Sequence, residues 1–332
     1  MHEPWSGRLR RTVKTPEGYL SALLAVLVLF FGALAPGFLS SGNAVNLIEG
    51  CCVTAIMAIG LLVVLVVGGI DISFAATASV AQYLAGYLAT RAHWPMPLVI
   101  AANLLTGALL GGLNALLIDR LRATSIIITI STMSLYFALL MYFTGGRSIY
   151  DLPAWWSDPV VLWQWSGEGD TTVRVTLPIL VLLVVAAFTA WLLNRTALGR
   201  QVHAVGGNPE AARRVGVRLL AVHLFAYGYL GLLAALAGLV QAHRVGESVP
   251  NALVGGELFV LASAVLGGAS LTGGTGTVGG VLLGIVLLAV LRNGLNLMGI
   301  SPYFFQVLLG LVVLASAAAT GRKHRRPRDA IA

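Results

Sequence analysis

The sequence predicts an all-α integral membrane protein with about ten transmembrane helices. Of the 332 residues, 58% are hydrophobic and 10% are charged, whereas a soluble domain has about 25% charged residues. Long apolar runs recur along the chain, and a helix of about 20 residues spans the ~30 Å hydrocarbon core of a bilayer. Strands of a membrane barrel are about 10 residues long and alternate polar with apolar side chains. The runs are too long and too uniformly apolar for that class.

The first expected helix follows a basic N-terminal segment, residues 1–18. A basic segment before an apolar run is also typical of a signal peptide. However, Pro36 stands directly after the would-be cleavage motif Ala33-Leu34-Ala35, and many apolar runs follow. We therefore expect an uncleaved first helix whose start is cytoplasmic.

Each further helix is an apolar run bounded by polar or glycine-rich residues. A tryptophan-rich polar loop, residues 145–173, separates the fifth helix from the sixth, and tryptophans at this density are typical of a membrane–water interface. Residues 195–218 form the longest inner loop. The expected helices are 19–39, 45–67, 74–90, 96–118, 124–144, 174–194, 219–242, 253–268, 276–292 and 301–320.

The distribution of positive charge predicts the topology. Counted from a cytoplasmic start, the inner segments hold 16 of the 21 Lys and Arg residues. This bias favours cytoplasmic termini and an even number of spans. The basic tail, residues 321–332, could also contact nucleic acid, but a positive anchor at the membrane surface accounts for its charge. We expect the bilayer as its partner and no nucleic acid.

An acidic side chain lies between the second and third expected helices, in the stretch Gly68-Gly69-Ile70-Asp71-Ile72-Ser73. An Asp at the bilayer centre costs about 2.5–3.5 kcal/mol on insertion scales, so such a residue is usually functional or paired. The glycines let the backbone turn and leave peptide groups that need partners. We expect Asp71 to stabilise this helix break through freed backbone amides and neighbouring hydroxyls, near an inner gate, without a need to bind a ligand itself.

A second glycine pair, Gly267-Gly268, interrupts the sequence between the eighth and ninth helices. Interrupted hydrophobic segments at corresponding places in two halves are typical of transporters. Aligned by the glycines, Asp71 matches Ser270 and Ser73 matches Thr272. This match predicts two related halves, helices two to five and seven to ten. The predicted helix-break or gate residues are Gly68, Gly69, Asp71, Ser73, Gly267 and Gly268.

The inner loop 195–218 contains a short helix with a marked start and end. Asn208 is the expected N-cap, Pro209 suits the first turn, and Glu210 complements the positive end of the helix. Gly216 fits the C-terminal stop. A capped helix held outside the membrane between two spans is predicted to be a docking surface, and an ordinary amphipathic connector is the alternative.

A path for a polar solute needs hydroxyls, amides and aromatic faces with few fixed charges. The hydroxyls of residues 124–144 could instead hold helices together. Glu49 and Glu257 are acids near or within the membrane, and each is either a path residue or the partner of a nearby polar group. The candidate path residues are Glu49, Asn103, Asn114, Thr129, Asn293, Asn296, Tyr303 and Gln306.

The chain carries no recognisable catalytic or metal site. A phosphate-binding P-loop needs a Lys after its glycines, and neither Lys14 nor Lys323 follows such a loop. The adjacent Cys51 and Cys52 have neither zinc spacing nor a disulfide framework, so we expect two small buried side chains. We predict no catalytic residues, no metal and no cofactor bound by this chain.

Several of these motifs, in this order, resemble a known family. Glu210-Ala211-Ala212, followed after three residues by Gly216, is similar to the EAA-type coupling loop of ABC importer permeases. The similarity to the branched-chain-permease-like family of ribose, arabinose and xylose permeases covers residues 20–320. The motifs that resemble this family are Gly68 through Ser73, Ala197-Leu198-Gly199-Arg200 through Asn208, Leu266 through Gly274, and Asn293-Gly294-Leu295-Asn296-Leu297 to Ser301-Pro302-Tyr303.

The resemblance implies a type II ABC importer permease fold for the transmembrane domain, residues 19–320, in the bacterial cytoplasmic (inner) membrane. It implies a permease dimer formed with a second copy or a paralogue, ABC ATPase subunits that use ATP and Mg²⁺, and a periplasmic or lipid-anchored sugar-binding protein. It also implies that the ATPase-coupling residues are Asn208, Pro209, Glu210, Ala211, Ala212 and Gly216.

Departures from the family pattern leave the identity of the sugar open. Glu49 stands where the family commonly has Gln, and Phe74-Ala75 stands where it has Val-Gly. We interpret the chain as the permease subunit of an ATP-driven importer for a monosaccharide or related sugar-like solute. The alternative is a secondary transporter or channel for a small polar solute. Further departures are at Phe137, Phe304, Phe305 and Leu309.

Overall fold

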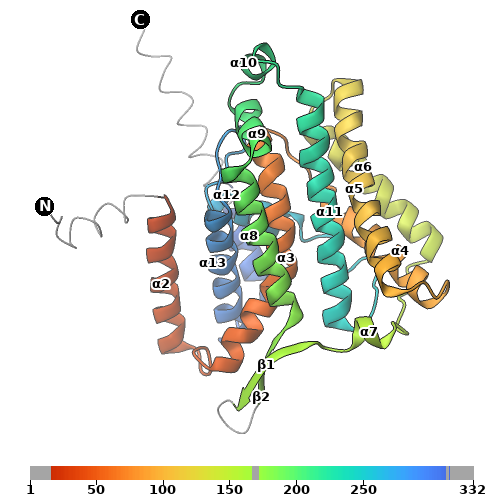
Figure 1. Ribbon diagram of the computed structural model, residues 1–332. Coiled ribbons are helices and arrows are strands. Elements are labelled where there is room, and N and C mark those ends of the chain that lie inside the picture. The colour runs from red at the N-terminus through yellow and green to blue at the C-terminus, as the bar shows by residue number, and fades with distance from the viewer. Residues whose placement is uncertain (1–15, 167–171, 312–313, 315–332) are drawn as a thin grey trace, which may run out of the picture.

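The computed structural model describes residues 16–166, 172–311 and 314 (Figure 1). Most helices run side by side in one bundle, with helix α10 at one end and a two-stranded hairpin at the other. We refer to these as the α10 end and the hairpin end. Residues 1–15 of the expected basic N-terminal segment, and the expected basic tail, lie outside the described residues.

The elements follow one another in the order that the apolar runs predict, with three short helices and two strands added between the fifth and seventh expected helices. The helices are α2 (Pro16–Leu34), α3 (Ser41–Val67), α4 (Phe74–Thr90), α5 (Met96–Leu121), α6 (Ser125–Thr144), α7 (Ala154–Ser157), α8 (Leu177–Arg195), α9 (Ala197–Gly207), α10 (Pro209–Arg214), α11 (Leu219–Val245), α12 (Glu257–Leu266) and α13 (Val278–Leu297), followed by a helix over Pro302–Leu311. The strands are β1 (Val161–Ser166) and β2 (Thr172–Thr176).

All ten expected segments overlap a described helix, and seven of the described helices are long and apolar enough to cross a membrane by themselves. The other three are shorter: α4 has 17 residues and α12 has 10, and the third is Pro302–Leu311. The chain is therefore a mostly helical, multi-pass membrane protein.

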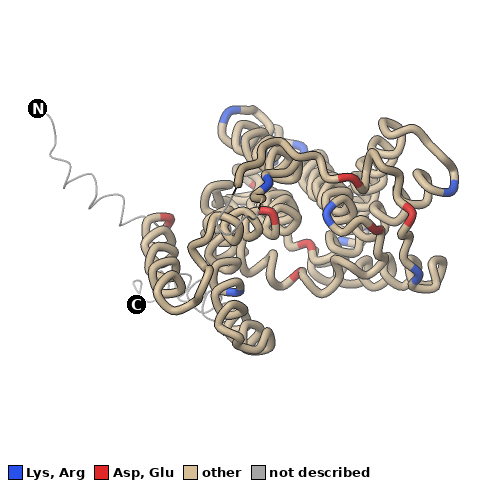
Figure 2. The backbone as a smooth tube through the Cα atoms, turned by 90° about the horizontal axis from the view of Figure 1, so that it is seen from below, with Lys and Arg blue, Asp and Glu red and all other residues tan. Residues whose placement is uncertain are grey.

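Helix α3 forms the centre of the bundle. From Cys51 to Val67 every side chain except that of Thr54 is buried. Helices α8, α9, α11, α12 and α13 all pack against α3. Helix α2, by contrast, packs mainly against α13 and lies at the edge of the bundle (Figures 1 and 2). Both cysteines are free and buried, as expected.

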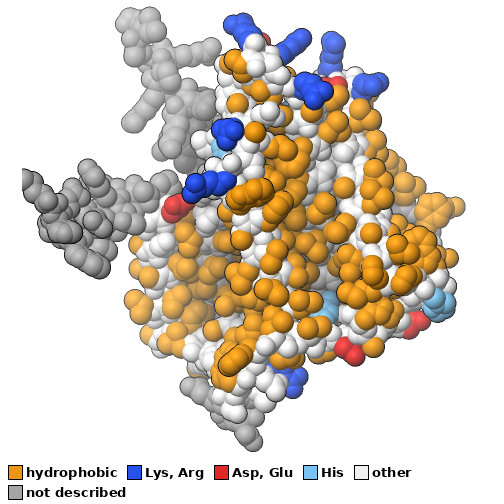
Figure 3. Space-filling view, viewed as in Figure 1, with side chains coloured by type: hydrophobic (Ala, Val, Ile, Leu, Met, Phe, Trp, Pro, Cys, Tyr) orange, Lys and Arg blue, Asp and Glu red, His pale blue; other side chains and the backbone are white. Residues whose placement is uncertain are grey.

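Helices α5 and α11 approach each other closely because glycines lie at their contact. A methyl group on Gly107 would overlap the carbonyl oxygen of Gly231, and one on Gly111 would overlap that of Tyr227. Small residues of this kind let membrane helices pack backbone to backbone. The flanks of the bundle carry many exposed apolar side chains (Figure 3), which suits contact with lipid.

Two stretches that the sequence analysis treats as loops contain secondary structure. The loop 145–173 holds α7 and β1, which pairs antiparallel with β2, with Trp163 opposite Val175 and Ser166 opposite Thr172. The inner loop holds the 11-residue helix α9 as well as α10. Helix α9 is too short for a span, but the helical spacing of Leu198, Val202 and Val205 is a signal that could have predicted it, and both valines are fully buried.

Candidate functional site

The first helix break is closed by backbone and side-chain hydrogen bonds. Gly68, with φ of 94°, ends α3. Its N–H donates to Leu65 O, and the N–H of Gly69 donates to Val64 O. This is the Schellman pattern, which satisfies the last carbonyls of a helix and favours glycine at the left-handed position. Gly69 is also required by space, because a methyl group there would overlap the hydroxyl of Tyr227.

Asp71 is 2% exposed and accepts three hydrogen bonds. The backbone N–H and the hydroxyl of Ser73 each donate to Asp71 Oδ1 at 2.7 Å. Asn114 of α5 donates from Nδ2 to Asp71 Oδ2 at 3.2 Å and to Ser73 Oγ at 2.7 Å. In an exposed turn, water would accept hydrogen bonds from these donors. In this buried turn the carboxylate accepts them instead, since buried polar groups need hydrogen-bond partners.

Helix α6 fixes the same turn from another side. Ser125 Oγ accepts from the N–H of Ile70 at 3.0 Å, and Thr129 Oγ1 donates to Ile70 O at 3.3 Å. Two of the predicted path residues, Asn114 and Thr129, therefore lie in the hydrogen-bond network of the first break. In the sequence, the hydroxyls of residues 124–144 could either line a path or hold helices together. The hydrogen bonds of Ser125 and Thr129 are of the second kind.

The second break repeats the first with a shift of one residue. Gly268, with φ of 92°, has its N–H donating to Val265 O, and the N–H of Ala269 donates to Ala264 O. Gly268 is thus the structural equivalent of Gly68. Two residues further on, the N–H of Thr272 donates to Ser270 Oγ at 3.2 Å, and the two hydroxyls are 2.9 Å apart. Gly267 has a different use: a methyl group there would overlap Gly280 O of α13.

Helices α9 and α10 lie at the α10 end. The predicted cap is confirmed: Asn208 Oδ1 accepts from the N–H of Ala211 at 3.0 Å, and Pro209 is the first helical residue. The predicted stop is confirmed as well, because Gly216 has φ of 89° and its N–H donates to Arg213 O. Arginine side chains gather at this end (Figure 3).

The side chains of α10 divide into one that faces the protein and several that do not. Ala212 is 3% exposed, whereas Glu210, Ala211, Arg213 and Arg214 are exposed. The short helix therefore presents charged side chains outward while Ala212 seals its inner face. Such a surface is free to receive another protein.

Three segments that are distant in sequence meet through glycines where α9 ends. The N–H of Gly274 donates to Val66 O at 2.8 Å. A methyl group on Gly206 of α9 would overlap that same carbonyl oxygen. A methyl group on Gly273 would lie 2.6 Å from Gly206 O and 2.9 Å from the Cα of Gly68. We call this contact of Val66, Gly68, Gly206, Gly273 and Gly274 the glycine junction.

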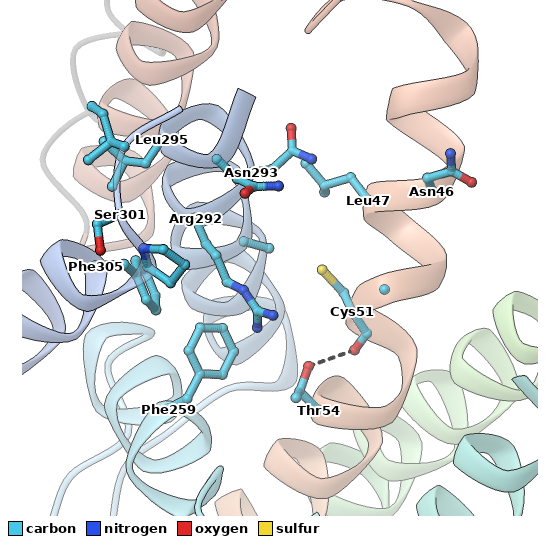
Figure 4. A pocket seen from close by; sticks show the side chains of 15 residues that line it. Asn46, Leu47, Cys51, Thr54, Phe259, Arg292, Asn293, Leu295, Ser301 and Phe305 are labelled. Carbon is cyan, nitrogen blue, oxygen red and sulfur yellow. Dashed lines mark hydrogen bonds between the residues drawn. The ribbon is translucent and has the colours of Figure 1, made fainter. Parts of the chain in front are cut away.

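A cavity of about 360 Å³ opens between α3, α12, α13 and residues 300–305. Three asparagines contribute amides, Thr54 and Ser301 contribute hydroxyls, and Phe259 and Phe305 contribute rings. Figure 4 shows Arg292 of α13 extending into the space between Phe259 and Thr54. The remaining lining residues are Asn46, Leu47, Gly50, Cys51, Ala289, Asn293, Leu295, Asn296, Ile300 and Pro302.

The structure distributes the predicted path residues among several places. Asn293 and Asn296 line the cavity. Asn293 also pairs with Asn43 of α3 through two reciprocal amide hydrogen bonds of 3.0 and 3.1 Å. Tyr303 is 76% exposed and Gln306 is exposed, and neither lines the cavity.

The remaining candidates lie away from the cavity. Glu49 accepts hydrogen bonds from the backbone N–H of Thr176, at 3.0 Å, and from its hydroxyl, which ties α3 to the base of the hairpin. Asn103 of α5 is fully buried, and its side chain has no hydrogen-bond partner among the described residues. Glu257 accepts from the N–H of Gly255 with both carboxylate oxygens, so it is the partner of a nearby polar group.

Sequence reasoning missed the cavity itself and the position of Arg292. In the sequence, Arg292 is one of the five Lys and Arg residues that lie outside the inner segments. Its place near the end of an apolar helix, one residue before Asn293, is the signal that could have drawn attention to it. The described residues hold no cluster of three or more His, Cys, Asp or Glu side chains that could bind a metal.

A multi-pass helical bundle with two glycine-capped breaks, a polar cavity and an exposed capped helix has the features of a membrane permease. Residues 43–317 match the family described as the permease component of the branched-chain amino acid transport system, and this chain belongs to that family.

Three relatives are similar along nearly their whole length. The ribose import permease protein RbsC of Escherichia coli K12 is 32% identical over 305 residues, which are 91% of this chain and 92% of the relative. The corresponding protein of Bacillus subtilis is 33% identical, over 90% and 91% of the two chains. The autoinducer 2 import system permease protein LsrC of Escherichia coli O157:H7 is 35% identical, over 91% and 86%.

Proposed function

We propose that this chain is the membrane-spanning permease subunit of an ATP-driven importer for a monosaccharide or related sugar-like solute. The observation that carries the proposal is the similarity, along about nine-tenths of the chain, to import permeases named for ribose and autoinducer 2. The cavity supports the same proposal, because its amides, hydroxyls and aromatic rings suit a polyhydroxylated solute. The volume of the cavity also falls in the range of small-molecule sites.

In this proposal α10 docks a separate ABC ATPase, which binds ATP and Mg²⁺. The exposed, capped helix and the arginines at its end of the bundle support this placement. The α10 end and both termini then face the cytoplasm of a bacterial cell, and the chain lies in the inner membrane. A periplasmic or lipid-anchored binding protein delivers the solute at the hairpin end, beside a second permease copy or paralogue.

We propose further that all ten apolar segments enter the membrane and that the chain has two related halves. The repeated Schellman caps at Gly68 and Gly268 support the second point. So do the repeated turns at Asp71–Ser73 and Ser270–Thr272.

Transport in sealed vesicles tests the proposal. The chain is reconstituted with a candidate ATPase and binding protein, sought among the neighbouring genes, and uptake of labelled ribose and other monosaccharides is measured. We expect uptake only with ATP inside the compartment that holds the ATPase. Uptake that follows an imposed pH or sodium gradient, with no need of ATP, would instead establish a secondary transporter.

Replacing Gly216 by Val tests the docking role of α10. The backbone there has φ of 89°, a conformation that costs a β-branched residue roughly 1–2 kcal/mol, so α10 should lose its fixed end. ATP-driven uptake should stop while the protein remains in the membrane. Gly216→Asn is the control, because Asn tolerates left-handed backbone. Full uptake by the Val variant would contradict the coupling assignment.

A further inference from the structure

The cavity contains a cation, Arg292, for which the part of the chain that the structure describes supplies no counterion. Within the described residues no carboxylate lies within ion-pair distance of Arg292, and its side chain has no hydrogen bond. An arginine near a membrane is costly unless it is hydrated or paired. The open cavity permits hydration but supplies no protein partner.

The acids closest in sequence to the lining residues are already engaged. Glu49 accepts two hydrogen bonds from Thr176, and Glu257 accepts two from the N–H of Gly255. Among the described residues that line the cavity there is no acid, and the guanidinium is the single charged group. Its five donors match a carboxylate or a phosphate in a two-point geometry.

The groups around Arg292 suit the remainder of such a ligand. The amides of Asn46 and Asn296 have no hydrogen-bond partner among the described residues, so both can serve hydroxyl groups. The ring of Phe259 lines the same cavity as Arg292 (Figure 4) and offers an apolar face. A cation, free amides and an aromatic face together describe a sugar that carries an oxyanion.

We propose that the cavity selects an acidic sugar, a monosaccharide bearing a carboxylate or phosphate group, and that Arg292 is the residue that determines this preference. A neutral sugar would contact the amides and the rings, but it would leave the guanidinium without a charged partner. The inference rests on the proposed function, since it names the class of solute for the same permease.

Direct binding tests the preference without any partner protein. The full chain in nanodiscs of zwitterionic lipid is equilibrated with labelled D-ribose, D-glucuronate or D-ribose 5-phosphate. A charge-assisted hydrogen bond contributes roughly 1.5–3 kcal/mol. We therefore expect one or both acidic sugars to bind at least about tenfold more tightly than ribose. The two acidic probes distinguish a carboxylate from a phosphate.

Three variants assign the effect to the residue. Arg292→Gln should abolish the preference, and Arg292→Lys should keep part of it, because Lys retains the charge but not the planar fork. Arg147→Gln removes another exposed arginine, which does not line the cavity, and should change nothing. Equal binding of neutral and acidic sugars, no binding of any probe, or an unchanged preference in Arg292→Gln would each overturn the inference.

Uptake separates this inference from the proposed function. ATP-dependent uptake of neutral sugars alone, unaffected by Arg292→Gln, would overturn the acidic preference and leave the importer intact. Uptake independent of ATP would overturn the importer, whatever the nanodisc result.

Discussion

The two helix breaks share a local geometry but differ in their surroundings. Gly68 and Gly268 end their helices with the same pair of hydrogen bonds, and in each break a Ser or Thr bonds back to the residue two positions earlier. The first break is buried and is held by side chains from α5 and α6. The second is partly exposed, and among the described residues its hydrogen bonds beyond the end of α12 run within its own loop or to Val66 O.

The difference teaches why only one break carries an acid. In the second, partly exposed turn a Ser suffices, because water can form the hydrogen bonds that the Ser270 side chain does not form. In the buried turn three donors converge with no water to serve them, and a carboxylate has acceptor sites for all three. The second break also touches α9 through Gly273 and Gly274. The first break is thus the more firmly anchored of the two, and α9 contacts both of them, at Val66 in the first and at Gly273 and Gly274 in the second.

The largest effect is expected at Gly206, where the first break, the second break and α9 meet. Gly206→Val should abolish ATP-driven uptake, and Gly206→Ala should impair it strongly, since even a methyl group would overlap Val66 O. Overpacking of this kind typically costs about 1–3 kcal/mol, so the segments should move apart. Uptake and the amount of protein in the membrane are measured together.

The neighbouring glycine provides a matched control for that experiment. Gly207 lies in the same helix, and a methyl group on it would meet no atom within 4 Å. Gly207→Ala should therefore retain normal uptake. If Gly206→Ala and Gly207→Ala behave alike, the glycine junction has no special role.

The next effect is expected at Asp71. Asp71→Ala leaves the Ser73 N–H and the Asn114 amide without their acceptor, at about 1–3 kcal/mol for each buried donor, so the unfolding midpoint in detergent should fall clearly. Asp71→Asn should fall less, because one acceptor oxygen remains. An unchanged midpoint and full uptake for Asp71→Asn would show that the carboxylate does not hold the break. A loss of uptake with no change in midpoint would point to a direct contact with solute.

The smallest effect is expected at Ser270, which accepts from the N–H of Thr272 as Asp71 accepts from that of Ser73. Ser270→Ala removes the bonds to Thr272, but water can replace them, so stability should stay within about 0.5 kcal/mol of the parent. The same unfolding measurement compares it with Asp71→Ala. A loss at Ser270 as large as that at Asp71 would mean that burial does not explain the difference between the breaks.

Local signals predicted the local structure well. The apolar runs located the helices, and the caps at Asn208 and Gly216 were readable because each depends on neighbours within a few residues. The glycine alignment paired Gly68 with Gly267, whereas the hydrogen bonds pair it with Gly268. Sequence alone could not decide this, because Gly267 is needed for packing against Gly280, a contact between different helices.

The candidate sites depended on contacts that no local pattern encodes. The glycine junction joins residues near 66, 206 and 274, and each glycine alone resembles any other turn or helix glycine. The cavity is assembled from α3, α12, α13 and residues 300–305, so Arg292 could be counted as a charge but not placed. Asn114 was predicted as a path residue for its polarity, and only the fold shows that its amide bonds Asp71.

The burial of α3 bears on how the protein is made. Apolar side chains gain no hydrophobic energy on leaving lipid for a helix interface, so the long apolar face of α3 is equally at home in both. During synthesis α3 can enter the bilayer among the first segments and remain there, fully solvated by lipid. The later helices α8 to α13 then displace that lipid and enclose it. The apolar residues from Cys51 to Val67 thus have two roles. They keep α3 in the bilayer early in synthesis, and they pack against the other helices later.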